Sequence, residues 1–167
     1  SNKSTPDKDS GYTTDDNTRA LIVSVLHNHI FNSEETLHLS KTYLNFLETA
    51  QHESGWFRTY IGKEIRHFSE DSLGRTIWAL GYIINKSNNQ EIIEKSIRIF
   101  DKSYKRIKEL KHLRAKAYSI FGLYYYYKKT KYPGLLATLK NLADDITKEY
   151  EANSSQEWNW FERNLTY

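Results

Sequence analysis

Acidic residues stand in two short clusters, and each cluster falls where a helix is predicted to begin. The first cluster is Asp15 and Asp16, and the second is Glu70 and Asp71. Carboxylates from two helices can act as acid, base or nucleophile on a sugar, or accept hydrogen bonds from vicinal hydroxyls. Glycoside hydrolysis would need them about 5–5.5 Å apart for retention and about 6.5–9.5 Å apart for inversion. We therefore take these four acids as the candidate catalytic residues.

The same acids suit a purely structural role. A carboxylate in the first turn complements the helix dipole, worth about 0.3–1 kcal/mol. Asp16 and Arg19 are three residues apart, and Asp71 and Arg75 are four apart, so each pair can bridge within its own helix. Spacing alone leaves both interpretations open, although two clusters at equivalent helix starts favour a shared site more than one would.

Aromatic residues are the second group that suits a sugar, because a flat ring can lie against the C–H face of a pyranose. They make up 14% of the chain. Tryptophan at helical spacing is more often core than site, which favours a core position for Trp78. Trp56 and Trp158 lie in predicted loops, so we expect them at the rim of a site. The other candidates near loops or helix starts are Phe57, Trp160 and Phe161.

Composition argues against several classes of protein. A net charge of +3 with interspersed signs is too mild for a nucleic-acid partner. Mean hydropathy is −0.75, and no apolar run approaches the ~20 residues of a membrane span, so we expect a soluble chain without a membrane partner. The compartment stays open, with the cytoplasm favoured. The chain has no cysteine, and its histidines lack the spacing of a helical zinc pair, so we expect no metal and no cofactor.

Helical spacing of apolar residues predicts one all-α domain over residues 14–167 after a flexible, polar lead-in over residues 1–13. Thr14, Ser69 and either Asn32 or Ser33 are the predicted helix caps. A loop with a short hairpin is expected over 52–68, and a tail without helical periodicity over 154–167. The six predicted helices cover 15–31, 34–51, 70–86, 90–110 with a bend near Lys102, 111–129 and 133–151.

These helices repeat as hairpins in units of roughly 40 to 55 residues, which is typical of a stacked or circular helical array. The first, third and fifth helices are the more apolar and aromatic, so we expect them to form an inner layer and the others an outer layer. The fifth is apolar or aromatic nearly all round, which predicts burial. A tetratricopeptide array is disfavoured, because its repeats have about 34 residues and a different spacing of signature residues.

Three segments together resemble a six-hairpin (α/α) toroid domain, the kind fused to or encoded beside bacterial glycosyltransferases and mannoside-processing enzymes. They are "GYTTDDNTRALIV" (11–23), "SEDSLGRTIWALGY" (69–82) and "EWNWFERNLTY" (157–167), and they follow the family pattern in order, with Ile77 in place of a leucine. The resemblance implies half of an (α/α)6 toroid, because the chain has three hairpins where a full ring has six. It also implies a sugar site at the N-terminal ends of the inner helices.

Taken with that resemblance, the candidate residues give two hypotheses. The first is a carbohydrate-active domain, glycosidase-like or glycosyltransferase-associated, which leaves open whether it is an enzyme. The second is a non-catalytic helical scaffold whose exposed inner helices are covered by the remainder of the toroid or by a homo-oligomer partner. The expected sugar-binding residues are Asn17, Arg19, Trp56, Phe57, Arg75, Trp78, Trp158, Trp160, Glu162 and Tyr167.

Overall fold

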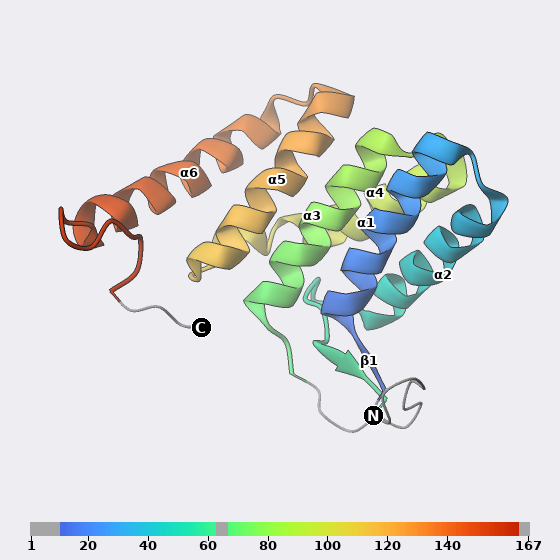
Figure 1. Cartoon of the computed structure of the whole chain (residues 1–167), viewed down its shortest axis with the longest axis horizontal. Helices are drawn as coiled ribbons and strands as arrows, with labels where there is room; N and C mark the ends of the chain where they lie inside the picture. The colour runs from blue at the N-terminus through green and yellow to red at the C-terminus, as the bar shows by residue number, and fades with distance from the viewer. Residues whose placement is uncertain (1–10, 63–66, 164–167) are drawn as a thin grey trace.

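The computed structural model describes residues 11–62 and 67–163, and within these ranges most of the chain is helical (Figure 1). Two short strands, β1 (Tyr12–Thr13) and β2 (Tyr60–Ile61), pair antiparallel beside the helices. The helices are α1 (Thr14–Phe31), α2 (Glu34–Ala50), α3 (Glu70–Lys86), α4 (Gln90–Tyr104), the 3-10 helix η2 (Ile107–Glu109), α5 (Leu113–Thr130) and α6 (Gly134–Asn153).

The helices form three consecutive hairpins in two layers. Helix α3 lies between α1 and α5 and packs on both, and these three form the inner layer that the sequence predicts. Each is backed by the next helix in sequence, so that α2 packs on α1, α4 on α3, and α6 on α5 (Figure 1). Because inner helices alternate with outer ones, the starts of α1, α3 and α5 lie at one end of the layer (Figure 1).

Side-chain caps fix where most helices begin. The predicted cap of α3 is confirmed, because the Ser69 side chain accepts a hydrogen bond from the Ser72 backbone N–H. Ser33, one of two candidates, caps α2 by accepting from the N–H of Thr36. The predicted cap of α1 is wrong by one residue, since Thr13 is the cap. The Thr14 hydroxyl instead donates to the Arg58 carbonyl, which ties α1 to the loop after α2.

The contact between α3 and α5 is unusually close because small residues face each other across it. A Cβ added to Gly74 would lie 2.5 Å from the carbonyl oxygen of Ala115. Gly81 and Gly122 likewise face backbone of the opposite helix. Glycine is therefore required at these positions by the approach of a neighbouring helix, because no side chain fits between the two backbones.

Burial is concentrated on α3, where eleven residues are buried. The expectation that α5 is buried on all sides is wrong. It buries only Ala115, Ser119, Gly122 and Leu123, while Phe121 is 52% exposed and Tyr124 is 47% exposed. The reason is position: α3 has inner-layer neighbours on both sides, whereas α5 packs on α3 and α6 and leaves one aromatic face open.

Other helix boundaries differ from the prediction by one or a few residues. Helix α4 ends at Tyr104, and a turn and η2 replace the predicted bent helix up to residue 110. The predicted hairpin loop pairs with itself through an antiparallel bridge between Arg58 and Phe68, while its strand β2 pairs with β1. Pro133 is the N-cap of α6 and not a residue of its first turn. Residues 154–163 contain no helix, as the tail prediction expected of this described part.

Candidate functional site

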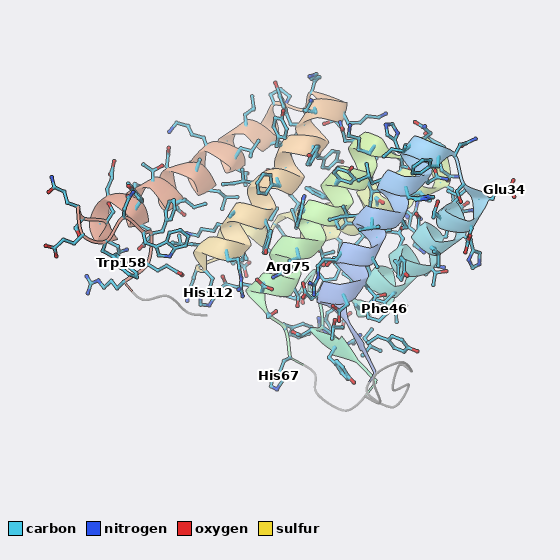
Figure 2. All side chains as sticks on the ribbon, in the orientation of Figure 1. Glu34, Phe46, His67, Arg75, His112 and Trp158 are labelled. Atoms are coloured by element: carbon cyan, nitrogen blue, oxygen red, sulfur yellow. The ribbon has the colours of Figure 1, made fainter. Side chains whose placement is uncertain are left out.

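A row of alternating charges crosses the starts of the three inner helices. Arg75 of α3 places its Nε 2.7 Å from Asp71 Oδ2 on its own helix and 2.8 Å from Asp15 Oδ1 on α1. Arg114 of α5 donates from Nε to the other oxygen of Asp71, also at 2.7 Å. Figure 2 shows Arg75 near the ends at which these helices begin. The two carboxylates are therefore held by guanidinium groups that reach across helix boundaries.

Arg75 is the most buried member of this row, with 16% of its side chain exposed. Its burial lowers the pKa, but the hydrogen bond and charge of Asp71 and the charge of Asp15 outweigh it, so the pKa of Arg75 is raised. The guanidinium also lies 4.6 Å from the centre of the Tyr118 ring on α5. Arg75 thus joins all three inner helices through ionic and cation–π contacts.

The row continues onto α1, where the first acidic cluster has mainly local partners. Arg19 Nη2 lies 2.6 Å from Asp15 Oδ2 and 2.8 Å from Asp16 Oδ1. The Asp16 carboxylate also accepts from the Thr13 hydroxyl, and Asn17 donates its side-chain amide to the Thr13 carbonyl. Asp16, Asn17 and Arg19 are accordingly engaged in holding the start of α1.

Glu70 has a different role from its neighbour Asp71. Its Oε2 accepts hydrogen bonds from the backbone N–H groups of Lys111 and His112, at 2.7 and 2.8 Å. Helix α5 begins at Leu113 and has no side-chain cap of its own. The carboxylate of Glu70 therefore orders the chain that leads into α5 from the neighbouring helix.

A cavity of ≈ 970 Å³ opens beside this row, between the starts of α3 and α5, the body of α6 and the C-terminal tail. Pockets that hold small molecules are typically about 300–1,000 Å³ and combine apolar walls with a few polar groups. This cavity has both kinds of lining. The residues around it are Phe68, Ser69, Glu70, Asp71, His112, Leu113, Arg114, Ala115, Ala117, Ile146, Trp160, Phe161 and Glu162.

The structure brings some of the predicted site residues to this cavity. Glu70, Asp71, Trp160 and Glu162 line it, and the Trp160 side chain is 44% exposed. Trp158 does not line the cavity; it lies in the same C-terminal tail and donates its indole N–H to the Glu162 carbonyl (Figure 2).

Other predicted residues lie elsewhere. Phe57, one of the expected sugar-binding residues, is fully buried in the core, where no ligand can reach it. Its side chain fills the core beneath the loop after α2, where an apolar ring is most stable. Trp56 is partly buried against the same core and does not line the cavity. Trp78 is half-buried and stacks on Tyr118, with ring centres 5.5 Å apart and an interplanar angle of 5°. Tyr167 lies outside the described residues.

Sequence reasoning missed Arg114 and Tyr118, although a signal for both was present. Arg114 is the second residue of α5, as Asp15 and Asp71 are the second residues of α1 and α3. Tyr118 follows it by four residues, as Arg19 follows Asp15 and Arg75 follows Asp71. Alignment of the three helix starts would have placed these pairs at equivalent positions of the repeat. Among the residues that the structure describes, no three histidine, aspartate or glutamate side chains gather as a metal site requires.

One solved structure has a fold similar to that of this chain. No protein-family model and no curated protein matches the sequence. A crystal structure of D-mannose isomerase matches the fold with a TM-score of 0.69 at 14% sequence identity. The match covers 89% of this chain and 46% of that one. The fold is all-α, and its three hairpins correspond to half of an (α/α)6 toroid. The chain spans less than half the length of the isomerase.

Within the described ranges of this chain, no helix is long and apolar enough to cross a membrane.

Proposed function

We propose that this chain is a carbohydrate-active domain that binds a glycan in the cavity between the starts of α3 and α5. The observation that carries the proposal is the pairing of oriented carboxylates with exposed aromatic surface in that cavity. The glycan accepts and donates hydrogen bonds through its hydroxyls, and its C–H faces pack on rings. The shared fold supports the same class of ligand, because the matched structure is that of a sugar isomerase.

Asp71 is the residue that we expect to contact the sugar most directly. Its two oxygens each accept one guanidinium hydrogen bond, from Arg75 and from Arg114, at 2.7 Å. A carboxylate oxygen has more than one lone pair, so each can accept a further hydrogen bond from a hydroxyl. Because two helices fix the carboxylate, it is oriented before the ligand arrives, which reduces the entropy lost on binding.

Trp160 and Phe161 supply the apolar wall opposite these polar groups. Their ring centres lie 5.6 Å apart at an interplanar angle of 80°, so the two rings meet edge to face. Trp160 is the more exposed and offers its ring to a sugar, while Phe161 also contacts Tyr150 of α6 and anchors the tail. The sugar would lie between this wall and the Asp71 carboxylate.

The proposal extends to a glycosidase-like or glycosyltransferase-associated protein in which Asp15, Asp16, Glu70 and Asp71 are the candidate catalytic acids. Of these, Asp71 has the best position for chemistry, since it lines the cavity and its partners hold it from two helices. Glu70 also lines the cavity, but one of its oxygens is used by two backbone N–H groups of the chain leading into α5.

The first test is binding of D-mannose, methyl mannoside and short mannosides, measured by tryptophan fluorescence and by calorimetry. We expect Trp160→Ala and Asp71→Asn each to weaken sugar binding by about tenfold, which corresponds to about 1.4 kcal/mol. Trp160 is exposed, so its removal leaves the fold intact. The matched control is Phe31→Ala, an aromatic residue 66% exposed at the far end of α1, which should leave affinity unchanged.

Hydrolysis of aryl mannosides and isomerisation of D-mannose should be assayed alongside binding. Loss of turnover in Asp71→Asn with sugar binding retained would assign Asp71 to the chemistry. Sugar binding that is absent in the parent chain, or unchanged in both Trp160→Ala and Asp71→Asn, would contradict the proposal.

A further inference from the structure

A second cavity, of ≈ 200 Å³, lies away from the proposed glycan site, between the last turns of α4 and α5 and the start of α6. The two cavities share no lining residue. Its walls are formed mainly by four aromatic rings and one acid, namely Phe100, Asp101, Tyr104, Tyr126 and Tyr132. The volume is below the range of about 300–1,000 Å³ that holds drug-sized molecules, so it suits a small head group.

Phe100 contacts the rings of two of the tyrosines that line the cavity. The Phe100 and Tyr126 rings meet edge to face, with centres 4.6 Å apart and an interplanar angle of 84°. The Tyr104 ring is nearly parallel to that of Phe100, with ring centres 6.3 Å apart and an interplanar angle of 21°. Phe100 is fully buried and forms the floor, whereas Tyr132 is 60% exposed and stands at the mouth.

Packing fixes these rings in place. The Tyr104 hydroxyl is within 2.8 Å of the Thr138 hydroxyl on α6 and donates to the Gly134 carbonyl at 3.3 Å. The Tyr132 ring packs on Gly134, where an added Cβ would lie 2.7 Å from a ring carbon. The cavity is therefore formed before any ligand binds, which favours affinity at a small site.

Asp101 is the charged group of this cavity. Its carboxylate accepts a hydrogen bond from the Tyr126 hydroxyl at 3.3 Å. Burial raises the pKa of Asp101, and the Tyr126 hydrogen bond lowers it in part. Within residues 11–62 and 67–163, no lysine or arginine forms an ion pair with it. A carboxylate among tyrosine rings, without a cation of its own, is a partner for a cationic ligand.

Other charges near the cavity act in both directions. The C-terminal ends of α4 and α5 carry partial negative charge that favours a cation, and the start of α6 carries partial positive charge that opposes it. The ammonium groups of Lys128 and Lys131 lie 5.6 Å from the ring centres of Tyr124 and Tyr127, which do not line the cavity. Lys102 and Lys105 are exposed to solvent, which screens their repulsion.

We propose that this aromatic cavity binds a quaternary ammonium group, with Asp101 as its counter-ion and the tyrosine rings packed around its methyl groups. Cations are attracted to ring faces, and aromatic cages with an acid are suited to trimethylammonium ligands. A primary ammonium has three N–H donors that need acceptors, and the cavity offers one carboxylate and a few hydroxyl groups, of which those of Tyr104 and Tyr126 already have partners. A quaternary group has no N–H that must keep a hydrogen bond, so its transfer from water into the cavity costs less free energy.

Three probes that share a hydroxyethyl arm test this proposal on the whole chain. Choline carries the trimethylammonium group, ethanolamine carries a primary ammonium, and 3,3-dimethylbutan-1-ol is the uncharged isostere of choline. Binding is measured by chemical-shift changes in the two-dimensional NMR spectrum. We expect choline to shift resonances of Tyr104, Tyr126 and Tyr132 and to bind about tenfold more tightly than either of the other probes.

Two substitutions and one control complete the experiment. Asp101→Asn keeps the size of the side chain and should weaken choline binding about tenfold, with no effect on the uncharged isostere. Tyr132→Ala removes an exposed ring and should weaken choline binding about two- to fivefold, as expected for the loss of a cation–π contact at an exposed site. Asp144→Asn, which changes a half-exposed carboxylate of α6 outside the cavity, should leave choline binding unchanged.

The proposal fails if choline and the uncharged isostere bind equally, because the cavity would then be merely apolar. It also fails if Asp101→Asn keeps full affinity for choline, or if choline shifts no resonance of these tyrosines. Tighter binding of ethanolamine than of choline would overturn the preference for a quaternary group. Proton chemical shifts of each variant without ligand show whether the fold is retained, and Tyr132→Ala serves where Asp101→Asn is not folded.

Discussion

Gly81 of α3 faces Gly122 of α5 so closely that a Cβ on either residue would overlap backbone atoms of the opposite helix. Together with Gly74 against Ala115, this contact runs along the length of the inner layer. The distance between α3 and α5 sets how far apart Asp71 and Arg114 stand, since each lies near the start of its helix. The glycines therefore determine the geometry of the charged row as well as the packing.

Gly122→Ala should lower stability because the new methyl group has no room. Alanine gains up to about 1 kcal/mol in helix propensity, whereas overpacking a tight helix contact costs about 1–3 kcal/mol. We expect a net loss of about 1–2 kcal/mol in the free energy of unfolding, measured by urea denaturation. Lys129→Ala, at an exposed position of the same helix, should change it by less than about 0.5 kcal/mol. Equal stability of Gly122→Ala and the parent chain would show that α3 and α5 can separate without cost.

The extent to which the sequence predicts this arrangement differs between local and long-range features. The sequence predicts the range of α3, residues 70–86, because the cap, the acidic first turn and the apolar spacing are all local features of that segment. The pairing of Arg75 with Asp71 was predicted for the same reason, since residues four apart meet on a helix.

The contacts that build the site across helices were not predictable in this way. Arg75 with Asp15, and Arg114 with Asp71, depend on how far α1 and α5 approach α3, which no local pattern specifies. The burial of Phe57 also depends on long-range packing that the local sequence does not specify. A loop position suggested exposure, but the loop folds over the core and buries the ring completely.

Arg75→Gln tests the energetic role of the charged row. The substitution removes the cation between Asp15 and Asp71 and leaves two partly buried carboxylates facing each other. Because both acids are about one-third exposed, we expect a loss of about 1–3 kcal/mol in the free energy of unfolding, less than for a fully buried pair. Lys140→Gln, which breaks an ion pair whose lysine is 75% exposed, should cost at most about 0.5 kcal/mol.

Salt provides an internal check on the same variant. Raising the salt concentration from about 0.1 M to about 1 M shortens the Debye length from about 10 Å to about 3 Å. Repulsion between Asp15 and Asp71 in Arg75→Gln should then weaken, so the variant should recover part of its stability relative to the parent chain. A deficit that does not change with salt would assign the role of Arg75 to packing on Tyr118.

Tyr126 should ionise later than most of the 13 tyrosines. Burial, the charge of Asp101 and the hydrogen bond to it raise the pKa of Tyr126 to about 12 from its ordinary value of 10.0. Since the folded state holds this proton more tightly, stability is unaffected below pH 10 and falls as the pH rises from about 10 through 12. Tyrosinate absorbance during an alkaline titration should lose its latest component in Tyr126→Phe. In Asp101→Asn, that component should move to lower pH.

Glu70 gives the clearest distinction between a structural and a catalytic acid. Its carboxylate accepts from the N–H groups of Lys111 and His112, so Glu70→Ala leaves both donors without this partner, and Glu70→Gln keeps an acceptor in the same place. Because these amides lie at an exposed helix start, we expect Glu70→Ala to cost about 0.5–2 kcal/mol, as for loss of a helix cap, and Glu70→Gln to cost less. Hydrogen exchange of the Lys111 and His112 amides should accelerate in Glu70→Ala and change little in Glu70→Gln. Glu70→Gln could instead keep these amides protected but abolish turnover of a sugar. That result would show that Glu70 takes part in the chemistry, because turnover would then need the charged carboxylate while amide protection would not.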